Sequence, residues 1–304
     1  MDINVKAVIP AAGLGTRLLP ATRAQPKEML PVGRKPVIQY VIEELKNAGI
    51  DNTLIITGQH KRAIEDHFDR SIPLTDINHR KGMDLRNAPF DVSGYEEREM
   101  RLFYVRQPVQ TGLAGAIALA QPFVGEEDFI VALGDVIYRT PAGEDSLVNR
   151  LLRTHVEREA AATIALQPVP REMVQRYGIV RARETEEPVV DLVDLVEKPR
   201  TEDAPSNLAI ASRYVLSPSI FEAIQEIKPG VGGELQLTDA LKLMLQNGMP
   251  VYGVLLQPGE RRFDIGSHDS YFRAFIELAL SDEELGAGLR EFTRALLPRL
   301  EGEE

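Results

Sequence analysis

The chain has 304 residues, a formal net charge of −11, 43% apolar residues and no cysteine. This composition is that of a globular protein with a real core, and it excludes disulfides and thiolate metal sites. The negative charge disfavours binding to nucleic acid or to anionic membranes, and no apolar run approaches the roughly 20 residues that span a bilayer. The N-terminus has no basic leader before an apolar core, so we expect a cytoplasmic protein without a signal peptide.

The first third of the chain alternates strand and helix patterns. Val5–Pro10 is a short apolar run, typical of a buried parallel strand. Residues 36–48 have apolar side chains at helical spacing, begin with a proline and end before a glycine. Thr53–Thr57 is a second buried strand, and residues 60–69 form a second helix. This order predicts a parallel sheet with right-handed crossovers.

Residues 70–99 are polar and aperiodic, so we expect an insertion or long loop there. The alternation then resumes, with predicted strands and helices at Leu102–Val105, 112–120, Phe129–Leu133, 145–158 and 161–167.

The second half is richer in β structure. Three closely spaced runs predict hairpins or a mixed-sheet extension: Ile179–Arg183, Val189–Val196 and Leu208–Leu216. Further helices, a strand and a helical C-terminal region are predicted at 217–226, 236–247, Val251–Leu256 and Ser267–Leu300, before an acidic tail at Glu301–Glu304. We therefore expect an α/β protein with a Rossmann-like mixed, mostly parallel sheet flanked by helices, a β-rich extension and C-terminal helices.

The loop Ala11-Ala12-Gly13-Leu14-Gly15-Thr16-Arg17 follows the first strand. Its two glycines let backbone N–H groups approach an anion closely, and Arg17 adds a fixed fork of donors for phosphate. The end of a parallel strand lies at the sheet edge where α/β proteins bind ligands. The loop therefore predicts a phosphate ligand, although a tight turn without a ligand stays open for these glycines alone.

Two other phosphate motifs are disfavoured. The dinucleotide fingerprint requires a third glycine and an acid at the end of the second strand, where this chain has Leu18 and Thr57-Gly58-Gln59. The P-loop requires a glycine followed by Lys and Ser or Thr, which is absent here. Lys27 lies between Pro26 and Pro31, in a segment that cannot be a helix interior, and is a candidate phosphate clamp.

The runs Pro10–Arg17 and Pro26–Pro31 together resemble the signature of sugar-1-phosphate nucleotidyltransferases. Within that superfamily, Ala21–Met29 resembles the bacterial UTP–glucose-1-phosphate uridylyltransferases (UDP-glucose pyrophosphorylases), and the resemblance extends from Val5 to about Tyr271. It implies a Mg²⁺-assisted, in-line attack of glucose-1-phosphate on the α-phosphorus of UTP, by a homodimer or homotetramer.

The resemblance also implies a domain division and a nucleotide site. Residues 1–280 would form one domain, with a nucleotide-binding half (1–140) and a sugar-phosphate-binding half (141–266), followed by a C-terminal helix and acidic tail (281–304). The implied catalytic residues are Arg17, Lys27 and Lys198. The implied nucleotide contacts are Ala11, Ala12, Gly13, Gly15, Thr16, Arg17, Glu28, Gln107, Gly112 and Asp135, with the Gln107 amide on the uracil edge and Gly112 leaving room for the ring.

Asp135 follows the predicted strand Phe129–Leu133, where a carboxylate is suited to Mg²⁺ but also to a simple turn. The resemblance implies that Asp135 and Asp264 share one Mg²⁺.

On the sugar side, the resemblance implies that Glu197 accepts hydrogen bonds from sugar hydroxyls and that Lys198 pairs with the sugar phosphate. A surface ion pair before a turn is the alternative. Tyr177, Gly178 and Asn207 would line the same site, with the segment Gly232–Asp239 in its wall.

One motif departs from the uridylyltransferases. They usually read Gly-Leu-Gly-His where this chain has Gly112-Leu113-Ala114-Gly115, and thymidylyltransferases read closer to Gly-Leu-Ala. A dTTP-using enzyme therefore stays open as an alternative. A catalytically silent regulatory paralogue is disfavoured because Lys27, Asp135, Lys198 and Asp264 are all present.

Overall fold

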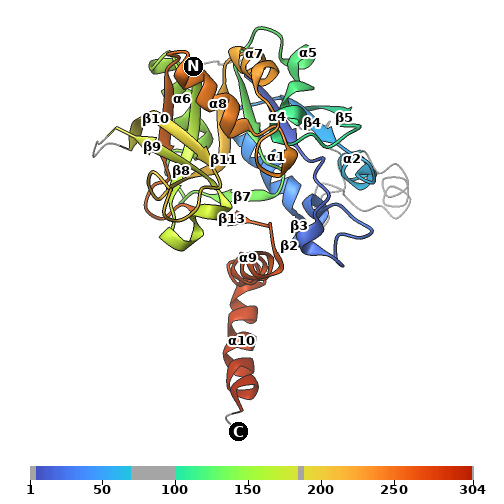
Figure 1. The fold of residues 1–304 in the computed structure, drawn as a ribbon. Helices are drawn as coiled ribbons and strands as arrows, with labels where there is room; N and C mark the ends of the chain where they lie inside the picture. The colour runs from blue at the N-terminus through green and yellow to red at the C-terminus, as the bar shows by residue number, and fades with distance from the viewer. Residues whose placement is uncertain (1–4, 70–99, 184–187, 303–304) are drawn as a thin grey trace.

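The computed structural model describes residues 5–69, 100–183 and 188–302, so the predicted insertion at 70–99 lies outside the described residues. Nine of the described strands form one sheet in the order β5-β4-β1-β6-β11-β8-β12-β10-β9, with helices packed against it (Figure 1). Because β11 pairs with both β6 and β8, the sheet runs continuously through the two predicted halves. The division at residue 140 stays a prediction.

The first half of the sheet is parallel, as predicted. Its strands are β1 (Lys6–Pro10), β4 (Asn52–Thr57), β5 (Arg101–Arg106) and β6 (Phe129–Ala132). Alternate residues of β1 enter different cores: Val8 packs on one face of the sheet, and Ala7 and Ile9 pack on the other. Burial on both faces explains why β1, β4 and β6 read as continuous apolar runs, whereas β5, at the edge of the sheet, is mostly exposed.

The prediction of a mostly parallel sheet is wrong beyond β6. The strands there are β8 (Ala162–Pro168), β9 (Gly178–Ala182), β10 (Val189–Glu197), β11 (Leu208–Leu216) and β12 (Val251–Leu255). β12 is parallel to β8, whereas β11 is antiparallel to β6 and β8, and β10 is antiparallel to β9 and β12. β9 also pairs with β11, which closes these five strands into a small barrel. The connection from β9 to β10 is too short for a crossover helix, so these neighbours must run antiparallel.

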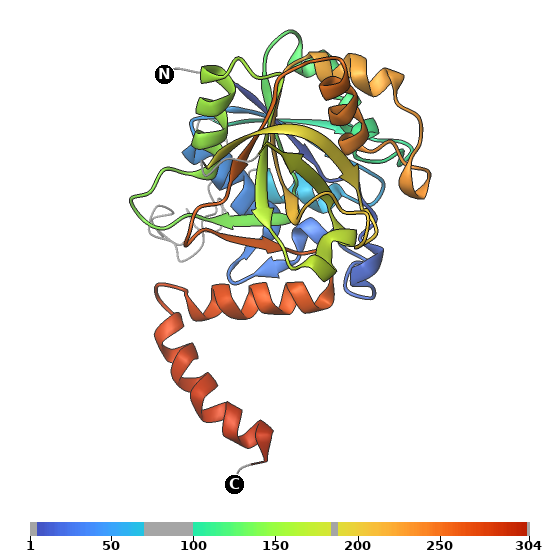
Figure 2. The ribbon, with the colours of Figure 1, turned by 60° about the vertical axis from the view of Figure 1, so that its left-hand side comes forward.

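Helices cover both faces of the sheet (Figure 2). One face is covered by α1 (Val37–Asn47), α2 (Arg62–Phe68) and α6 (Leu147–Glu157). The other is covered by α4 (Leu113–Ala118), α5 (Gln121–Val124), α7 (Ser219–Glu226) and α8 (Leu237–Gln246). Short 3-10 turns occur at η1 (Thr16–Leu18), η2 (Lys27–Met29), η5 (Arg171–Arg176) and η6 (Val231–Gly233).

Two small sheets were not predicted. β7 (Val136–Arg139) pairs antiparallel with β13 (Arg261–Asp264), and β2 (Pro31–Val32) pairs with β3 (Lys35–Pro36). A separate apolar cluster lies between these ribbons and α9 (His268–Leu280). The β7–β13 ribbon joins chain segments that are distant in sequence and places them side by side.

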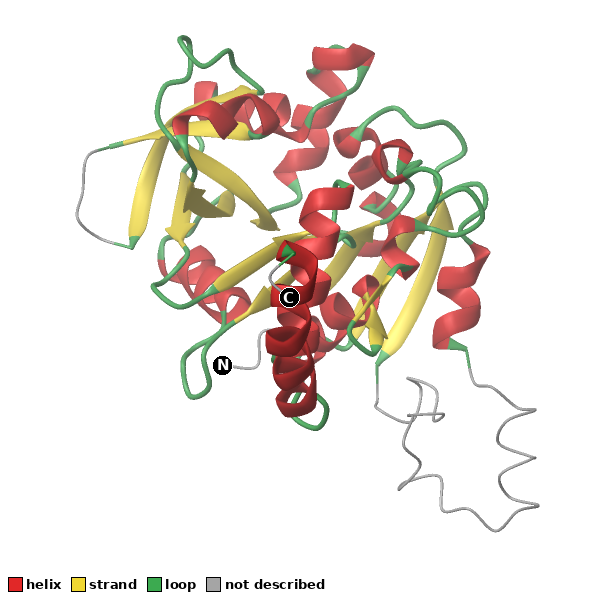
Figure 3. Cartoon of the chain, turned by 90° about the horizontal axis from the view of Figure 1, so that it is seen from below, coloured by secondary structure: helices red, strands yellow, loops and turns green. Residues whose placement is uncertain are grey.

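The helical C-terminal region consists of α9 and α10 (Gly286–Glu301). α9 packs beneath β13 and β2, whereas α10 points away from the body and buries only Gly286 (Figure 2). Seen from below, these helices lie near the middle of the molecule, with strands to both sides (Figure 3). None of the helices in the described ranges is both long and apolar enough to cross a membrane.

Candidate active site

A cavity of about 1210 Å³ opens where the strands of the first half end. Pro10, Gln107 and Leu133, at the ends of β1, β5 and β6, line it. This is the edge of an α/β sheet at which ligands bind. The lining also brings together predicted residues from both halves of the chain: Ala12, Gly13, Arg17, Lys27, Glu28, Gln107, Gly112, Asp135, Tyr177, Gly178, Glu197, Lys198 and Asp264.

Four predicted residues lie outside this lining: Ala11, Gly15, Thr16 and Asn207. Ala11 is buried, and its N–H donates to the carbonyl of Ile56 at 2.8 Å. Asn207 is exposed just before β11, and Ile210, further along that strand, lines the cavity instead.

The loop after β1 lies against the stem of Lys27. A Cβ added to Gly13 would lie 3.8 Å from Lys27 Cε, and one added to Gly15 would lie 3.4 Å from Lys27 Cβ. Gly15 has a φ of 67°, in the left-handed region that favours glycine, and its carbonyl accepts a hydrogen bond from Thr22 Oγ1 at 2.8 Å. The Lys27 side chain therefore enters the cavity beside the backbone of the predicted phosphate loop.

Lys27 Nζ donates to Asp135 Oδ2 at 2.5 Å. Burial lowers the pKa of Lys27, but the carboxylates of Asp135 and Glu28 outweigh it and raise that pKa above its ordinary value. Burial likewise raises the pKa of Asp135, but Lys27 outweighs it and holds that pKa below its usual range. Both groups are therefore charged at neutral pH.

Glu28, predicted to contact the nucleotide, lines the cavity but has a buried partner. Lys61 Nζ, at the start of α2, donates to Glu28 Oε2 at 2.7 Å, and the two side chains are 5% and 1% exposed. Burial raises the pKa of Glu28 against the opposing charges of Lys61 and Lys27. The pair fixes the short turn η2, which carries Lys27.

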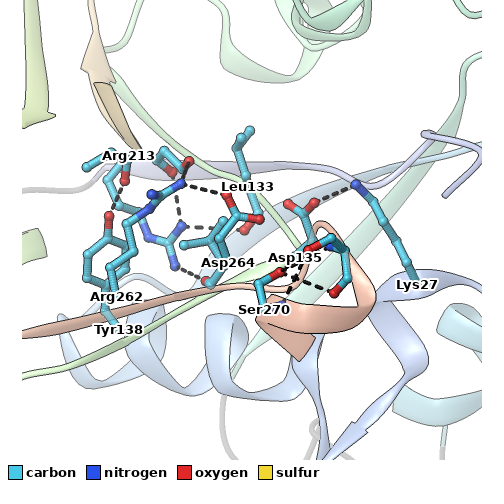
Figure 4. Close-up of polar contacts among 12 residues, drawn as sticks. Lys27, Leu133, Asp135, Tyr138, Arg213, Arg262, Asp264 and Ser270 are labelled. Atoms are coloured by element: carbon cyan, nitrogen blue, oxygen red, sulfur yellow. Dashed lines mark hydrogen bonds and ion pairs between the residues drawn. The ribbon is translucent and has the colours of Figure 1, made fainter. Parts of the chain in front are cut away.

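The β7–β13 ribbon brings the two predicted metal acids together. Asp264 is in register with Val136, and the N–H of Ile265 donates to the carbonyl of Asp135 at 3.0 Å. Figure 4 shows Asp135 and Asp264 in the same part of the site. Burial and the neighbouring charge of Asp135 raise the pKa of Asp264, despite the guanidinium of Arg262. The sequence alone gave no sign that these two acids meet.

A fully buried arginine holds the turn that carries Asp135. Arg213 donates through Nη1 to the carbonyl of Leu133 at 3.4 Å and through Nη2 to the carbonyl of Val136 at 2.8 Å. Its charge is paired with Glu44 at 2.6 Å. Because Leu133 and Val136 flank the turn, these bonds fix the backbone on both sides of Asp135.

The sugar side of the cavity is built by β9, β10 and α8. Glu197 accepts from Thr238 Oγ1 at 2.7 Å and pairs with Lys198 at 3.0 Å. Gly178 is in register with Glu197, and a Cβ added to Gly178 would lie 2.8 Å from Ile210 Cδ1. A side chain at position 178 would therefore displace the end of the Ile210 side chain. Lys198 has a φ of 43°, a conformation uncommon outside glycine that often marks functional sites.

On the predicted base side, Gln107 is 5% exposed and its Nε2 donates to the carbonyl of Gly112 at 3.4 Å. Gly112 has a φ of 100°, and a Cβ added there would lie 2.6 Å from the carbonyl oxygen of Leu235. The close approach of the Leu235 backbone is thus one reason for this glycine, and the room that it would leave for a ring stays a prediction.

Sequence reasoning missed Arg262, which lines the cavity and donates to Asp264 Oδ2 at 3.0 Å. The signal that could have identified Arg262 is its position two residues before Asp264, because residues two apart on a strand share a face. That signal needs the strand to be predicted, and β13 was not. Thr238 was predicted only as part of the wall segment.

The charges of the site are suited to phosphates and a divalent cation. Arg17, Lys27 and Lys198 line one cavity in a chain of net charge −11. Within the described ranges, no cluster of three or more His, Cys, Asp or Glu side chains could hold a metal. Two carboxylates that line the cavity, those of Asp135 and Asp264, are available to a cation. This matches Mg²⁺, which commonly takes one or two protein carboxylates and completes its shell with substrate phosphates and water.

Comparison with known proteins identifies the family. Residues 6–280 match the nucleotidyl transferase family model. A UTP–glucose-1-phosphate uridylyltransferase of Staphylococcus haemolyticus is 43% identical over 291 residues, which are 96% of this chain and 98% of that protein. The UTP-bound UGPase of Acinetobacter baumannii has a TM-score of 0.83 and 35% identity, with 96% of this chain and 98% of that chain covered. A UDP-glucose pyrophosphorylase complexed with UDP-glucose has a TM-score of 0.78 and 36% identity, with 89% and 97% covered. The chain is thus a nucleotidyltransferase, and it belongs to the nucleotidyl transferase family, in the group of UTP–glucose-1-phosphate uridylyltransferases.

Proposed function

We propose that this chain transfers the uridylyl group of UTP to glucose-1-phosphate, which gives UDP-glucose and pyrophosphate. The observation that carries the proposal is a cavity whose lining includes Lys27, the two acids Asp135 and Asp264, and the Glu197–Lys198 pair. The activity of the Staphylococcus haemolyticus relative and the UTP and UDP-glucose held by the two similar structures support the choice of substrates.

The reaction needs no covalent enzyme intermediate. An oxygen of the sugar phosphate attacks the α-phosphorus in line, and pyrophosphate leaves, so catalysis consists of positioning and charge neutralisation. In this assignment the loop backbone and Arg17 hold the triphosphate, and Lys27 neutralises charge at the transferred phosphorus. Lys198 orients the attacking phosphate, and Glu197 accepts from sugar hydroxyls. Asp135 and Asp264 would hold Mg²⁺, which supplies further neutralisation of phosphate charge when bound.

The nucleotide test separates UTP from dTTP. We expect pyrophosphate release with glucose-1-phosphate to have a kcat/KM for UTP at least about 10-fold above that for dTTP, which carries a C5 methyl group and lacks the 2′-hydroxyl of UTP. The step from dUTP to dTTP adds the methyl group alone and should cost about 10-fold, the lower end for one extra methyl group in a packed pocket. In this proposal the pocket for the base is packed by buried Gln107 and by the Leu235 backbone, which lies against Gly112. A preference for dTTP would overturn the base assignment alone. No release with any nucleoside triphosphate would favour the silent paralogue.

We also propose that a second copy of the chain covers the C-terminal helices. Large apolar side chains on α9 and α10 are exposed: Phe272 (56%), Ile276 (55%), Phe292 (61%) and Leu300 (72%). An isolated helix is only marginally stable in water, so an unpacked α10 needs a partner.

The predicted cytoplasmic location, which relies on composition, stays a prediction.

We expect light scattering after gel filtration to find an assembly of at least two chains, which Phe292→Asp shifts to the monomer. Val156→Asp is the matched control, because Val156 is also an exposed apolar residue (39%) but lies on α6 in the body. A monomeric native protein, or an equal response to both substitutions, would contradict this assembly.

A further inference from the structure

Arg262 is a buried cation that the proposed mechanism does not use. It lies two residues before Asp264 on β13, so both side chains share one face of the strand. The Arg262 side chain is 5% exposed and that of Asp264 is 33% exposed, and Arg262 Nη2 donates to Asp264 Oδ2 at 3.0 Å (Figure 4). Burying a guanidinium is costly, so its contacts require an explanation.

The guanidinium is held from several sides. Nη2 also donates to Ser212 Oγ at 3.2 Å, and the guanidinium carbon lies 5.3 Å from the centre of the Tyr177 ring. Nε is buried and has no hydrogen-bond partner within the described part of the chain. An unsatisfied buried donor is destabilising, so its presence here needs an explanation. Arg262 is therefore a held group against which the more exposed carboxylate of Asp264 is oriented.

Ser212 connects this arrangement to the other metal acid. It has a φ of 63° and lies where the register of β11 against β8 shifts between Ile210 and Tyr214, an irregularity of the pairing that we call the Ser212 bulge. Its hydroxyl accepts from Arg262, while its carbonyl accepts from Arg213 Nη1 at 3.0 Å. Arg213 is the residue that fixes the turn of Asp135. Ser212 thus contacts two buried arginines: Arg262, which donates to Asp264, and Arg213, which fixes the turn of Asp135.

We propose that Arg262 is a positioning residue for the divalent cation: it occupies Oδ2 of Asp264 and leaves Oδ1 for the metal, at a place set by the Ser212 bulge. This inference rests on the proposed function, because the Asp135–Asp264 metal site is part of that proposal. Partners that orient metal ligands typically change metal affinity by about 10- to 100-fold when they are removed.

The test measures binding without turnover. UTP is titrated into the full chain by calorimetry, in EDTA and in Mn²⁺, with no sugar phosphate present. The ratio of the two dissociation constants is the gain that the metal confers. Arg262→Gln should lower the gain by about 10-fold or more. Because the gain is a ratio, any loss of charge attraction for the nucleotide affects both dissociation constants and cancels. Arg262→Lys, which keeps the charge without the fork, should recover part of the gain.

Asp264→Asn removes the ligand itself and should abolish most of the gain. In that background Arg262→Gln should cost nothing further, since a positioning residue acts through its ligand. Ser212→Ala deletes the hydroxyl that accepts from Arg262, so it should also lower the gain. If Arg262→Gln does not fold, Ser212→Ala serves as the test of the role of Arg262. The role of Arg262 is overturned if Asp264→Asn loses the gain while Arg262→Gln keeps it. If Arg262→Gln does not fold, Ser212→Ala takes its place in this comparison. In either case the proposed function stands. A gain that is intact in Asp264→Asn overturns the metal site, and this inference with it.

Discussion

Replacing Lys27 by alanine is expected to lower kcat/KM by about 100- to 1000-fold, which is the range for loss of one group that stabilises transition-state charge. The lysine ammonium enters the cavity beside the phosphate loop and lies 2.5 Å from Asp135. When a phosphate takes the place of that carboxylate, the same cation faces the charge that develops on the transferred group. Pyrophosphate release gives the rate, and thermal unfolding followed by circular dichroism checks that the fold persists.

Two companion variants separate this role from that of the metal. Lys27→Arg keeps the charge but changes its shape, so it should retain part of the activity. Asp135→Asn should also lower the rate, but it alone should shift the Mg²⁺ concentration needed for half-maximal activity. Near-normal turnover in Lys27→Ala would contradict the assigned role. If Lys27→Ala instead shifts the Mg²⁺ concentration needed for half-maximal activity, Lys27 acts through Asp135.

The parts of the fold that sequence predicts best are those whose pattern is local. Val5–Pro10 and Phe129–Leu133 are buried on both faces, so their apolar runs mark β1 and β6 directly. The phosphate loop and Lys27 were found because glycines, prolines and a cation occur within one short segment. In these cases, each inference needed only residues that are near one another in the chain.

The parts that sequence predicts poorly depend on pairing between distant segments. β7 and β13 are four-residue strands of mixed polarity, and only their pairing with each other identifies them as strands. The meeting of Asp135 with Asp264 and the place of Arg262 follow from that pairing. The barrel is a similar case, because the contact of β9 with β11 leaves no periodic signal in either segment.

Replacing Lys61 by methionine is expected to lower the free energy of unfolding by about 3–5 kcal/mol at neutral pH, because it leaves one buried charge without its partner. Glu28 is 1% exposed, and its bond to Lys61 Nζ at 2.7 Å is what compensates its burial. Lys27 is near, but its ammonium is already bonded to Asp135. The decrease in the free energy of unfolding should therefore exceed that caused by an ordinary substitution at the start of a helix.

The pH dependence of this loss identifies its cause. Burial already raises the pKa of Glu28, and removal of Lys61 should raise it further. In the unfolded chain a glutamate titrates near 4.3, so below that pH Glu28 is protonated in both states and the variant loses little. Just above a pH of about 4.3, both folded proteins retain the proton that the unfolded chain releases, so both lose stability alike. Once the pH exceeds the raised pKa of Glu28 in the intact protein, only the variant continues to lose stability, and its deficit grows. Urea unfolding at about pH 5 and pH 8 should thus show the larger deficit at pH 8.

The double variant Lys61→Met with Glu28→Gln is the control. It removes the carboxylate together with its partner, so it should recover most of the stability and lose the pH dependence, as expected when both members of a buried pair are replaced. A deficit in Lys61→Met that is equal at both pH values would instead assign the effect to packing of the lysine stem. If the pair fixes η2, the double variant should still show lower turnover, because a neutral Glu28→Gln side chain no longer restrains the backbone that delivers Lys27.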